Sequence, residues 1–204
     1  MRVDSNDYEY LFRTMFNFKP DYVVHLAART DLNGVDLEDY ISNTSGVENI
    51  LKCCKELPNL KRLILASTKL IVPTDAQVSD LTSYDPDTIY GESKALGEKF
   101  VESNDYFENW IIVRPTSIWG PWSLAEHIPY GKFFQIIKKG LYIHPAVVEQ
   151  PRYFGYVENS CFQIYALMVD SSDDVLKGKY YLADYAIYDI KNWADLISAK
   201  FGRG

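Results

Sequence analysis

The sequence predicts an α/β fold in which a doubly wound parallel sheet is followed by a smaller mixed portion. Three short β-branched segments recur at long spacing, at residues 22–26, 63–66 and 110–113. Each is apolar on consecutive positions, as expected of strands buried on both faces of a parallel sheet. Helical patterns long enough for crossover connections fill both intervals. This alternation of strands and helices indicates right-handed βαβ units.

Each expected strand is introduced by turn residues, and each expected helix shows one apolar face. Pro20, Pro58 and Asn109 precede the three strands in order. Between the first two strands, residues 40–54 repeat apolar and small side chains at helical spacing, and residues 89–100 do so between the second and third. These segments are therefore expected to be the crossover helices of the sheet.

After about residue 120 the alternation is less regular. The sequence predicts helices over residues 130–139, 158–169 and 190–201, and strands over residues 153–157 and 179–182. We therefore expect two domains, residues 1–120 and residues 121–204, of which the second is the smaller and mixed one. Some of its later segments could rejoin the parallel sheet.

Composition places the 204-residue chain among ordinary globular proteins. Apolar residues make up 47% of it and charged residues 24%, and its net charge is −7. The basic residues are scattered, so we expect no nucleic-acid partner. No apolar run approaches the roughly 18 residues of a membrane span, and the polar N-terminus does not resemble a signal peptide. Three cysteines without a disulfide pattern predict a reduced, cytoplasmic location.

The segment from Tyr90 to Lys94 is the main candidate for chemistry. On a helix, these two residues lie one turn apart on the same face. An ammonium group close to a phenol favours the phenolate and lowers the phenol pKa from about 10, which suits acid–base catalysis at neutral pH. The same Lys94 could donate to ribose hydroxyls. The alternative is an ordinary amphipathic helix with an exposed Tyr and Lys, because Y-x-x-x-K is common by chance.

Hydroxyl groups follow the second expected strand. Ser67 and Thr68 lie at the edge where open α/β sheets form their ligand crevice. A hydroxyl there could hydrogen-bond a substrate oxygen and share a proton path with Tyr90. A helix cap or a strand-end turn explains the two residues equally well. His127 and His144 have no partners at metal spacing, so no metal site is expected.

Six motifs in the same order resemble the extended short-chain dehydrogenase/reductase family, the NAD-dependent epimerase/dehydratases of nucleotide-sugar type. They are similar to the family's fourth strand with its cofactor turn, its N-x-x-G-x-x-N-L helix, its Ser-Ser/Thr pair, its Y-x-x-x-K pair, its R-P-x-x-V-Y-G-P turn and its R-D-F-x-Y-V-x-D segment. The matching segments are, in order, residues 20–28, 43–51, 67–68, 90–94, 114–121 and 152–159.

The resemblance implies a partial Rossmann fold that binds NAD or NADP, with Tyr90, Lys94 and Thr68 as the catalytic residues. It implies that residues 1–120 hold the cofactor and that residues 121–204 belong to a substrate-binding domain. The residues implied to contact the cofactor are Leu26, Ala27, Ala28, Asn43, Ser67, Tyr90, Lys94 and Pro115. The residues implied to contact a nucleoside-diphosphate sugar are Thr30, Thr68, Ser117 and, through the phosphates, Arg152.

The resemblance also implies the reaction. Epimerisation is the first expectation and carbonyl reduction the second, and a homodimer is a further expectation because the family often dimerises. Lys69 and Leu70 stand where the dehydratases of the family carry Asp-Glu, which disfavours dehydration. Ser117 in place of Asn and Asn159 in place of Asp leave the identity of the sugar open.

One family feature is missing from the sequence. None of the eleven glycines forms a G-x-x-G-x-x-G or G-x-G-x-x-G cluster, whose backbone amides bind pyrophosphate at a helix N-terminus. Set against the family, the chain is expected to lack the N-terminal Gly-rich unit and the C-terminal end. The alternative function is therefore a catalytically inactive member that acts only through protein contacts. The residue that selects NAD or NADP would lie in the same absent unit, so both cofactors stay open.

Overall fold

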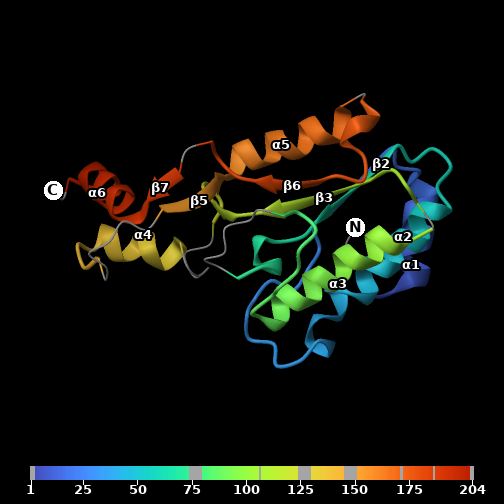
Figure 1. The fold of residues 1–204 in the computed structure, drawn as a ribbon, viewed down its shortest axis with the longest axis horizontal. Helices are drawn as coiled ribbons and strands as arrows, with labels where there is room; N and C mark the ends of the chain where they lie inside the picture. The colour runs from blue at the N-terminus through green and yellow to red at the C-terminus, as the bar shows by residue number, and fades with distance from the viewer. Residues whose placement is uncertain are drawn as a thin grey trace. The chain divides into compact units, whose positions relative to one another are not determined.

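The computed structural model describes residues 3–73, 80–105, 107–123, 130–144, 151–170, 172–185 and 187–202. The chain divides into two compact units. The first comprises Met1–Pro115 and Gln163–Tyr181, and the second comprises Thr116–Phe162 and Leu182–Gly204. Figure 1 shows the helices and strands of both units.

The first unit is built on a sheet with the strand order β1-β2-β3-β6. Its strands are β1 (Tyr22–His25), β2 (Arg62–Ala66), β3 (Trp110–Pro115) and β6 (Lys179–Leu182). β1 pairs with β2 in parallel, and β2 pairs with β3 in parallel. The register places Leu65 of β2 opposite Ile112 of β3, and both side chains are buried. The predicted α/β fold with a parallel sheet is confirmed.

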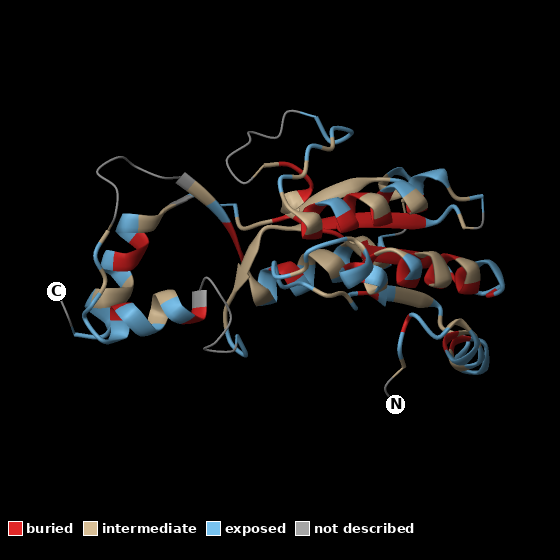
Figure 2. Cartoon of the chain, turned by 90° about the horizontal axis from the view of Figure 1, so that it is seen from below, coloured by how far each residue is buried: buried red, intermediate tan, exposed pale blue. Residues whose placement is uncertain are grey.

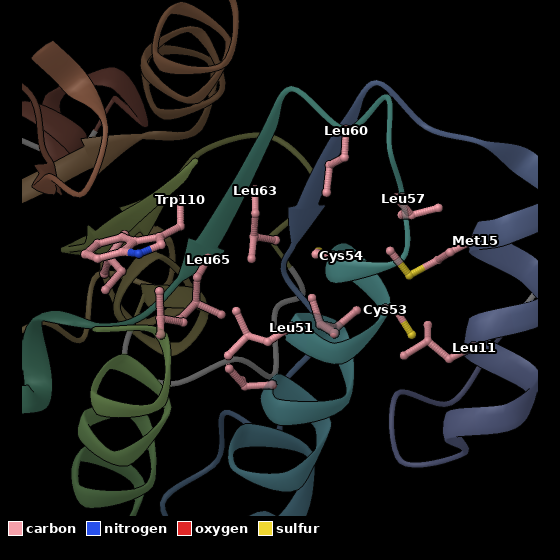
Figure 3. Packing of buried hydrophobic residues seen from close by; sticks show 14 residues of the cluster. Leu11, Met15, Leu51, Cys53, Cys54, Leu57, Leu60, Leu63, Leu65 and Trp110 are labelled. Atoms are coloured by element: carbon pink, nitrogen blue, oxygen red, sulfur yellow. The ribbon is translucent and has the colours of Figure 1, made fainter. Parts of the chain in front are cut away.

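Helices cover both faces of this sheet. α2 (Ser45–Lys55) and α3 (Ile89–Ser103) lie on one face, and the later turns of α5 (Val157–Val169) lie on the other (Figure 1). Arg62 of β2 donates a hydrogen bond to the backbone oxygen of Leu167 in α5. The core between α2 and the strands is apolar and closely packed, as Figure 3 shows. Its side chains include Leu51, Cys53, Leu63, Leu65, Trp110 and Ile112.

The N-terminal helix α1 (Tyr8–Phe18) was not among the predicted elements. Its N-cap is Asp7, whose carboxylate accepts a hydrogen bond from the backbone N of Tyr10 at 3.0 Å. Leu11 and Met15, four residues apart, are buried on the side that packs against α2 (Figure 3). One apolar stripe is therefore enough to fix this short helix on the core.

The helix predicted over residues 40–54 is interrupted. Its first part is the 3₁₀ helix η1 (Glu38–Asn43), which is kinked at Tyr40, and α2 begins only at Ser45. The side chain of Asn43 explains the break, because it is hydrogen-bonded to the backbone of Arg29 and holds η1 against that loop.

The second unit has a three-stranded sheet of order β4-β5-β7. Its strands are β4 (Ser117–Trp119), β5 (Pro151–Tyr156) and β7 (Ile187–Asp189), and its helices include α4 (Tyr130–Lys138) and α6 (Ile190–Lys200). β4 is parallel to β5, and β7 is antiparallel to it. Trp193 of α6 packs on Phe154 of β5, with ring centroids 4.6 Å apart. The strands β4 and β7 were not predicted.

Burial follows this division of strands and helices. Figure 2 shows the buried residues along the strands and on the inner sides of the helices, whereas the outer sides of the helices are exposed. Within the described ranges, no helix combines the length and the apolar character needed to cross a membrane.

Candidate active site

The carboxyl ends of the parallel strands bring polar side chains to one edge of the first unit. Ser67 and Thr68 follow β2 directly, and both are buried. The backbone N of Ser67 donates a hydrogen bond to the carbonyl oxygen of Val113 at 2.7 Å, which extends the pairing of β2 with β3. Pro115 ends β3 at the same edge. Open α/β sheets form their ligand crevices at such an edge.

Thr68 is both a helix cap and a partner of Tyr90. Its Oγ1 accepts a hydrogen bond from the backbone N of Leu70 at 3.2 Å and so caps the 3₁₀ helix η2 (Lys69–Ile71). The cap that the sequence left as an alternative is therefore present. The same hydroxyl takes part in a side-chain hydrogen bond with Tyr90. Capping and a site role are compatible here, because one hydroxyl can accept and donate at once.

Gly91 allows α3 to come close enough for this contact. A Cβ atom at Gly91 would lie 2.1 Å from the carbonyl oxygen of Leu70, so no other residue fits without a backbone shift. Thr88 caps the helix start, since its Oγ1 accepts a hydrogen bond from the backbone N of Gly91 at 3.0 Å. The two caps and the glycine place Tyr90, in the first turn of α3, against the end of β2.

The electrostatic setting of Tyr90 differs from the simplest sequence argument. Burial raises the pKa of Tyr90 above its usual value, the hydrogen bond with Thr68 lowers it, and Tyr40 raises it further. The lowering that the sequence argument assigned to Lys94 is not among these effects. In this arrangement, Thr68 is the group that favours the phenolate.

Lys94 is buried one turn after Tyr90. Burial lowers the pKa of Lys94 to about 8, and Glu98 acts in the opposite direction. At neutral pH the side chain is therefore largely an ammonium group. His25, at the end of β1, lies in the same surroundings, because burial and then Lys94 lower its pKa to about 4. His25 is accordingly neutral at pH 7.

Two buried polar atoms at this edge have no hydrogen-bond partner among the described residues. They are the Oγ of Ser67 and the Nε2 of His25. Buried polar atoms in proteins nearly always have a hydrogen-bond partner. Two such atoms without a partner at a strand edge are therefore consistent with a site where a polar ligand supplies the partners. The donors nearby in the fold, Thr68 and Lys94, suit a ligand rich in hydroxyl and carbonyl oxygens.

Asn43 is fully buried and links this edge to α3. Its Nδ2 donates to the carbonyl oxygen of Arg29 at 2.9 Å and to the Oγ of Ser93 at 3.0 Å, and its Oδ1 accepts from the N of Arg29 at 2.9 Å. Ser93 in turn donates to the carbonyl oxygen of Tyr90 at 2.7 Å. These bonds make Asn43 a support of the loop after β1, while its contact with a cofactor stays a prediction.

The loop after β1 carries the remaining residues predicted for this unit. Leu26, Ala27 and Thr30 are exposed and Ala28 is half-buried, so their surface is open to a ligand. Tyr40 supports the loop from below: its hydroxyl donates to the carbonyl oxygen of Asp31 at 2.8 Å, and its ring lies 6.0 Å from that of Tyr90. Sequence reasoning singled out neither Tyr40 nor Ser93 for the site.

Ser117 and Arg152 belong to the second unit. Ser117 of β4 pairs with Phe154 of β5, and Arg152 lies two residues before Phe154 on the same strand. Because side chains alternate along a strand, Ser117 and Arg152 project from the same face of this sheet. The structure thus groups the predicted residues into one set per unit.

The same sheet borders a hollow of about 650 Å³ lined by Trp119, Tyr156, Asn159 and Asp184, among others. Asp184 was missed by sequence reasoning. Its carboxylate accepts hydrogen bonds from the backbone N of Tyr156 at 3.0 Å and from the Nδ2 of Asn159 at 2.9 Å. Asn159, noted from the sequence as a departure, thus has a local structural partner. Among the described residues, no three His, Cys, Asp or Glu side chains are grouped as a metal site requires.

Comparison with known families gives one assignment. The sequence profile described as "NAD dependent epimerase/dehydratase family" matches residues 1–183. The chain is 29% identical over 154 residues to the GDP-6-deoxy-D-talose 4-dehydrogenase of Aggregatibacter actinomycetemcomitans, covering 74% of this chain and 52% of the relative. It is 26% identical over 144 residues to a probable dTDP-glucose 4,6-dehydratase of Sinorhizobium fredii, covering 63% and 41%. The chain therefore spans about half of these relatives or less.

Solved structures share the fold. The Bordetella bronchiseptica enzyme WbmG, in complex with NAD and UDP, matches 100% of this chain and 63% of its own, with a TM-score of 0.81 and 25% identity. The UDP-glucose 4-epimerase of Thermus thermophilus, in complex with NAD, matches 100% of this chain and 69% of its own, with a TM-score of 0.77 and 23% identity.

Proposed function

The chain belongs to the NAD-dependent epimerase/dehydratase family, as its motifs predicted, and we propose that it carries the acid–base residues of an NAD(P)-dependent reaction on a nucleoside-diphosphate sugar. The observation that carries the proposal is the burial of Thr68, directly after β2, together with Tyr90 and Lys94 of α3, where Thr68 lowers the pKa of Tyr90. Two segments remote in sequence contribute one hydroxyl each to this contact. An ordinary surface helix would not bury all three side chains.

The residues at this edge fit the nicotinamide riboside end of NAD(P). Lys94 supplies an ammonium group for ribose hydroxyls, and the unpaired Oγ of Ser67 supplies a further polar contact. NAD(P), when bound, supplies the hydride acceptor and donor. Tyr90 takes the proton of the sugar hydroxyl as its carbon is oxidised, and returns it to the carbonyl oxygen when that carbon is reduced. Thr68 hydrogen-bonds the reacting oxygen in both directions.

Epimerisation is the reaction we place first, and reduction of a carbonyl group second. Removal of water would need a further acid and base beside the trio, and the two positions after Thr68 are Lys69 and Leu70, which supply no carboxylate. The named functions of the relatives include a 4-dehydrogenase and a 4-epimerase. Hydride transfer at one sugar carbon is common to both of our candidate reactions.

The second unit is the part we assign to the sugar nucleotide. Arg152 projects from β5 with a planar guanidinium group that can bind two phosphate oxygens at once, and Ser117 of β4 projects from the same face of the sheet. We assign the cofactor and the catalytic residues to the first unit, because Ser67, Thr68, Tyr90 and Lys94 all belong to it.

Two measurements test the proposal. NADH and NADPH fluorescence is titrated with the protein and with Lys94→Met. UDP-, GDP- and dTDP-hexoses are incubated with the protein and NAD(P)+, and keto-sugar forms of these nucleotides with the protein and NAD(P)H, while proton NMR follows the configuration at the sugar carbons. We expect saturable cofactor binding that Lys94→Met weakens, and inversion or reduction at one carbon. If neither cofactor binds the protein, the enzyme proposal fails and a family member acting only through protein contacts remains.

A further inference from the structure

The buried face of α3 continues past the two residues of the sequence motif. Tyr90, Lys94 and Glu98 are spaced four residues apart, so they follow one another along one face of the helix, and all three are buried. Glu98 is 0% exposed. A carboxylate so deeply buried needs a built environment to compensate its charge.

Arg114 of β3 provides that environment. Its Nε donates to Oε1 of Glu98 at 3.0 Å and its Nη2 donates to Oε2 at 2.7 Å, which forms a two-pronged ion pair between side chains that are both 0% exposed. The hydroxyl of Tyr84 lies 2.9 Å from Oε2 of the same carboxylate. Arg114 directly precedes Pro115, so the pair ties the middle of α3 to the end of the strand that borders the site.

We propose that Glu98, held in place by Arg114, is a positioning residue that keeps the side chain of Lys94 charged at the site. This inference rests on the proposed function of Lys94. It assigns the Glu98–Arg114 pair a role beyond stability, because Glu98 follows Lys94 by one turn on the buried face of α3.

The charged and titratable groups around Lys94 support this assignment. Glu98 acts on Lys94 from its own helix, and His25, which is neutral at pH 7, interacts with it from the end of β1. Burial lowers the pKa of Lys94 to about 8, and Glu98 is the group that opposes this shift. Around Glu98 itself lie Arg114 of β3 and the Tyr84 hydroxyl, and beyond them lie Glu102, Lys179 and Tyr181. Without the Glu98 charge, burial would act on Lys94 unopposed.

The Glu98–Arg114 pair could instead serve stability alone. Replacing both charges with neutral side chains distinguishes that role from the proposed effect on Lys94. Glu98→Gln alone leaves the guanidinium of Arg114 buried without a carboxylate and is expected to destabilise the fold. In Glu98→Gln with Arg114→Gln, two amides replace the two charges and can hydrogen-bond each other. If the role is only structural, this double variant should have a native fold and a native pKa of Lys94. The proposed role predicts instead that the pKa of Lys94 stays lowered although the fold is native.

The experiment is a pH titration of Lys94 in protein labelled with ¹³C at the lysine ε carbon, with the resonance assigned by Lys94→Met. In the double variant, confirmed as folded by its urea unfolding curve, we expect the Lys94 midpoint to fall by about one pH unit or more. Glu98→Asp keeps the charge and is expected to leave the midpoint nearly unchanged. Glu92→Gln removes an exposed charge from the same helix and is the matched control.

Every outcome of this titration either supports the inference or overturns it. An unchanged Lys94 midpoint in the folded double variant overturns the inference, and so does a fall in Glu98→Asp as large as in the double variant. The titration needs neither cofactor nor turnover. If Lys94 responds to Glu98 as expected but Lys94→Met binds NADH normally, the proposed function of Lys94 fails while the coupling to Glu98 stands.

Discussion

Gly91→Ala is the substitution that most directly tests how the site is assembled. The added Cβ would lie 2.1 Å from the carbonyl oxygen of Leu70, and contacts under 3.0 Å are essentially never seen for real Cβ atoms. Either the start of α3 or η2 must therefore move by at least about 0.9 Å, the difference between these two distances. The atom in the way is a backbone oxygen, so no side-chain rotation relieves the contact.

The consequences follow from that displacement. Overpacking of this kind costs about 1–3 kcal/mol of unfolding free energy, which urea unfolding would measure. The shift separates Tyr90 from Thr68, and misplacement of a reacting group by about 1 Å can cost on the order of 100-fold in turnover. Glu92→Ala, at the next position and exposed, is the control and should change neither quantity appreciably. A Gly91→Ala protein with native stability and native turnover would refute our account of the close approach.

Three further outcomes are expected. Tyr90→Phe keeps the ring and should fold normally but lose on the order of 100-fold or more in turnover, since it removes the acid–base group; near-native rates would take Tyr90 out of its role. His25 has a folded pKa of about 4 against 6.5 in the unfolded chain, so the unfolded state binds more protons between these values and stability falls as pH drops from 6.5 towards 4, by at most about 3 kcal/mol. His25→Leu should flatten that part of the urea-derived stability profile, and an unaltered profile would contradict the assigned pKa. Arg152→Met should raise the KM for a sugar nucleotide at least about tenfold and leave NADH titration unchanged; loss of NADH binding instead would count against a phosphate contact to the sugar nucleotide.

The strands and the main helices were predictable because their signals are local. β2 and β3 are runs of consecutive apolar residues, and α3 shows its buried face at regular spacing, so their sequences alone indicate their structure. The strands β4 and β7 have three residues each, which is too short to show any period. α1 carries a usable signal in Asp7 and the Leu11–Met15 spacing, but Tyr10, Phe16 and Phe18 of the same helix are exposed and blur the pattern.

The supports of the site were harder to predict because they are long-range. Asn43 and Ser93 are 50 residues apart, and their hydrogen bond exists only once η1 and α3 are packed together. Glu98 and Arg114 are separated by 16 residues and lie on different elements. The spacing of Glu98 from Lys94 is visible in the sequence, yet a charged residue on a helix is usually exposed, and only its partner on β3 explains why this one is not.

The hydroxyl of Thr68 sets a limit on how the proton can move. A hydroxyl has one hydrogen and two acceptor lone pairs, and the backbone N of Leu70 already occupies one of the lone pairs. While Tyr90 is a phenol, it can donate to the remaining lone pair of Thr68. Once Tyr90 is a phenolate, it can only accept a hydrogen bond. The single hydrogen of Thr68 can then be donated either to Tyr90 or to a substrate oxygen, but not to both. Thr68 therefore favours the phenolate most when no substrate oxygen is present, and a substrate that takes the Thr68 hydrogen for itself makes Tyr90 a stronger base. Burial, which raises the pKa of Tyr90, acts in the same direction. Because both effects raise the pKa of Tyr90, they also favour the neutral phenol at pH 7, so in the proposed reaction the phenolate that removes a proton must form while Thr68 still donates to it.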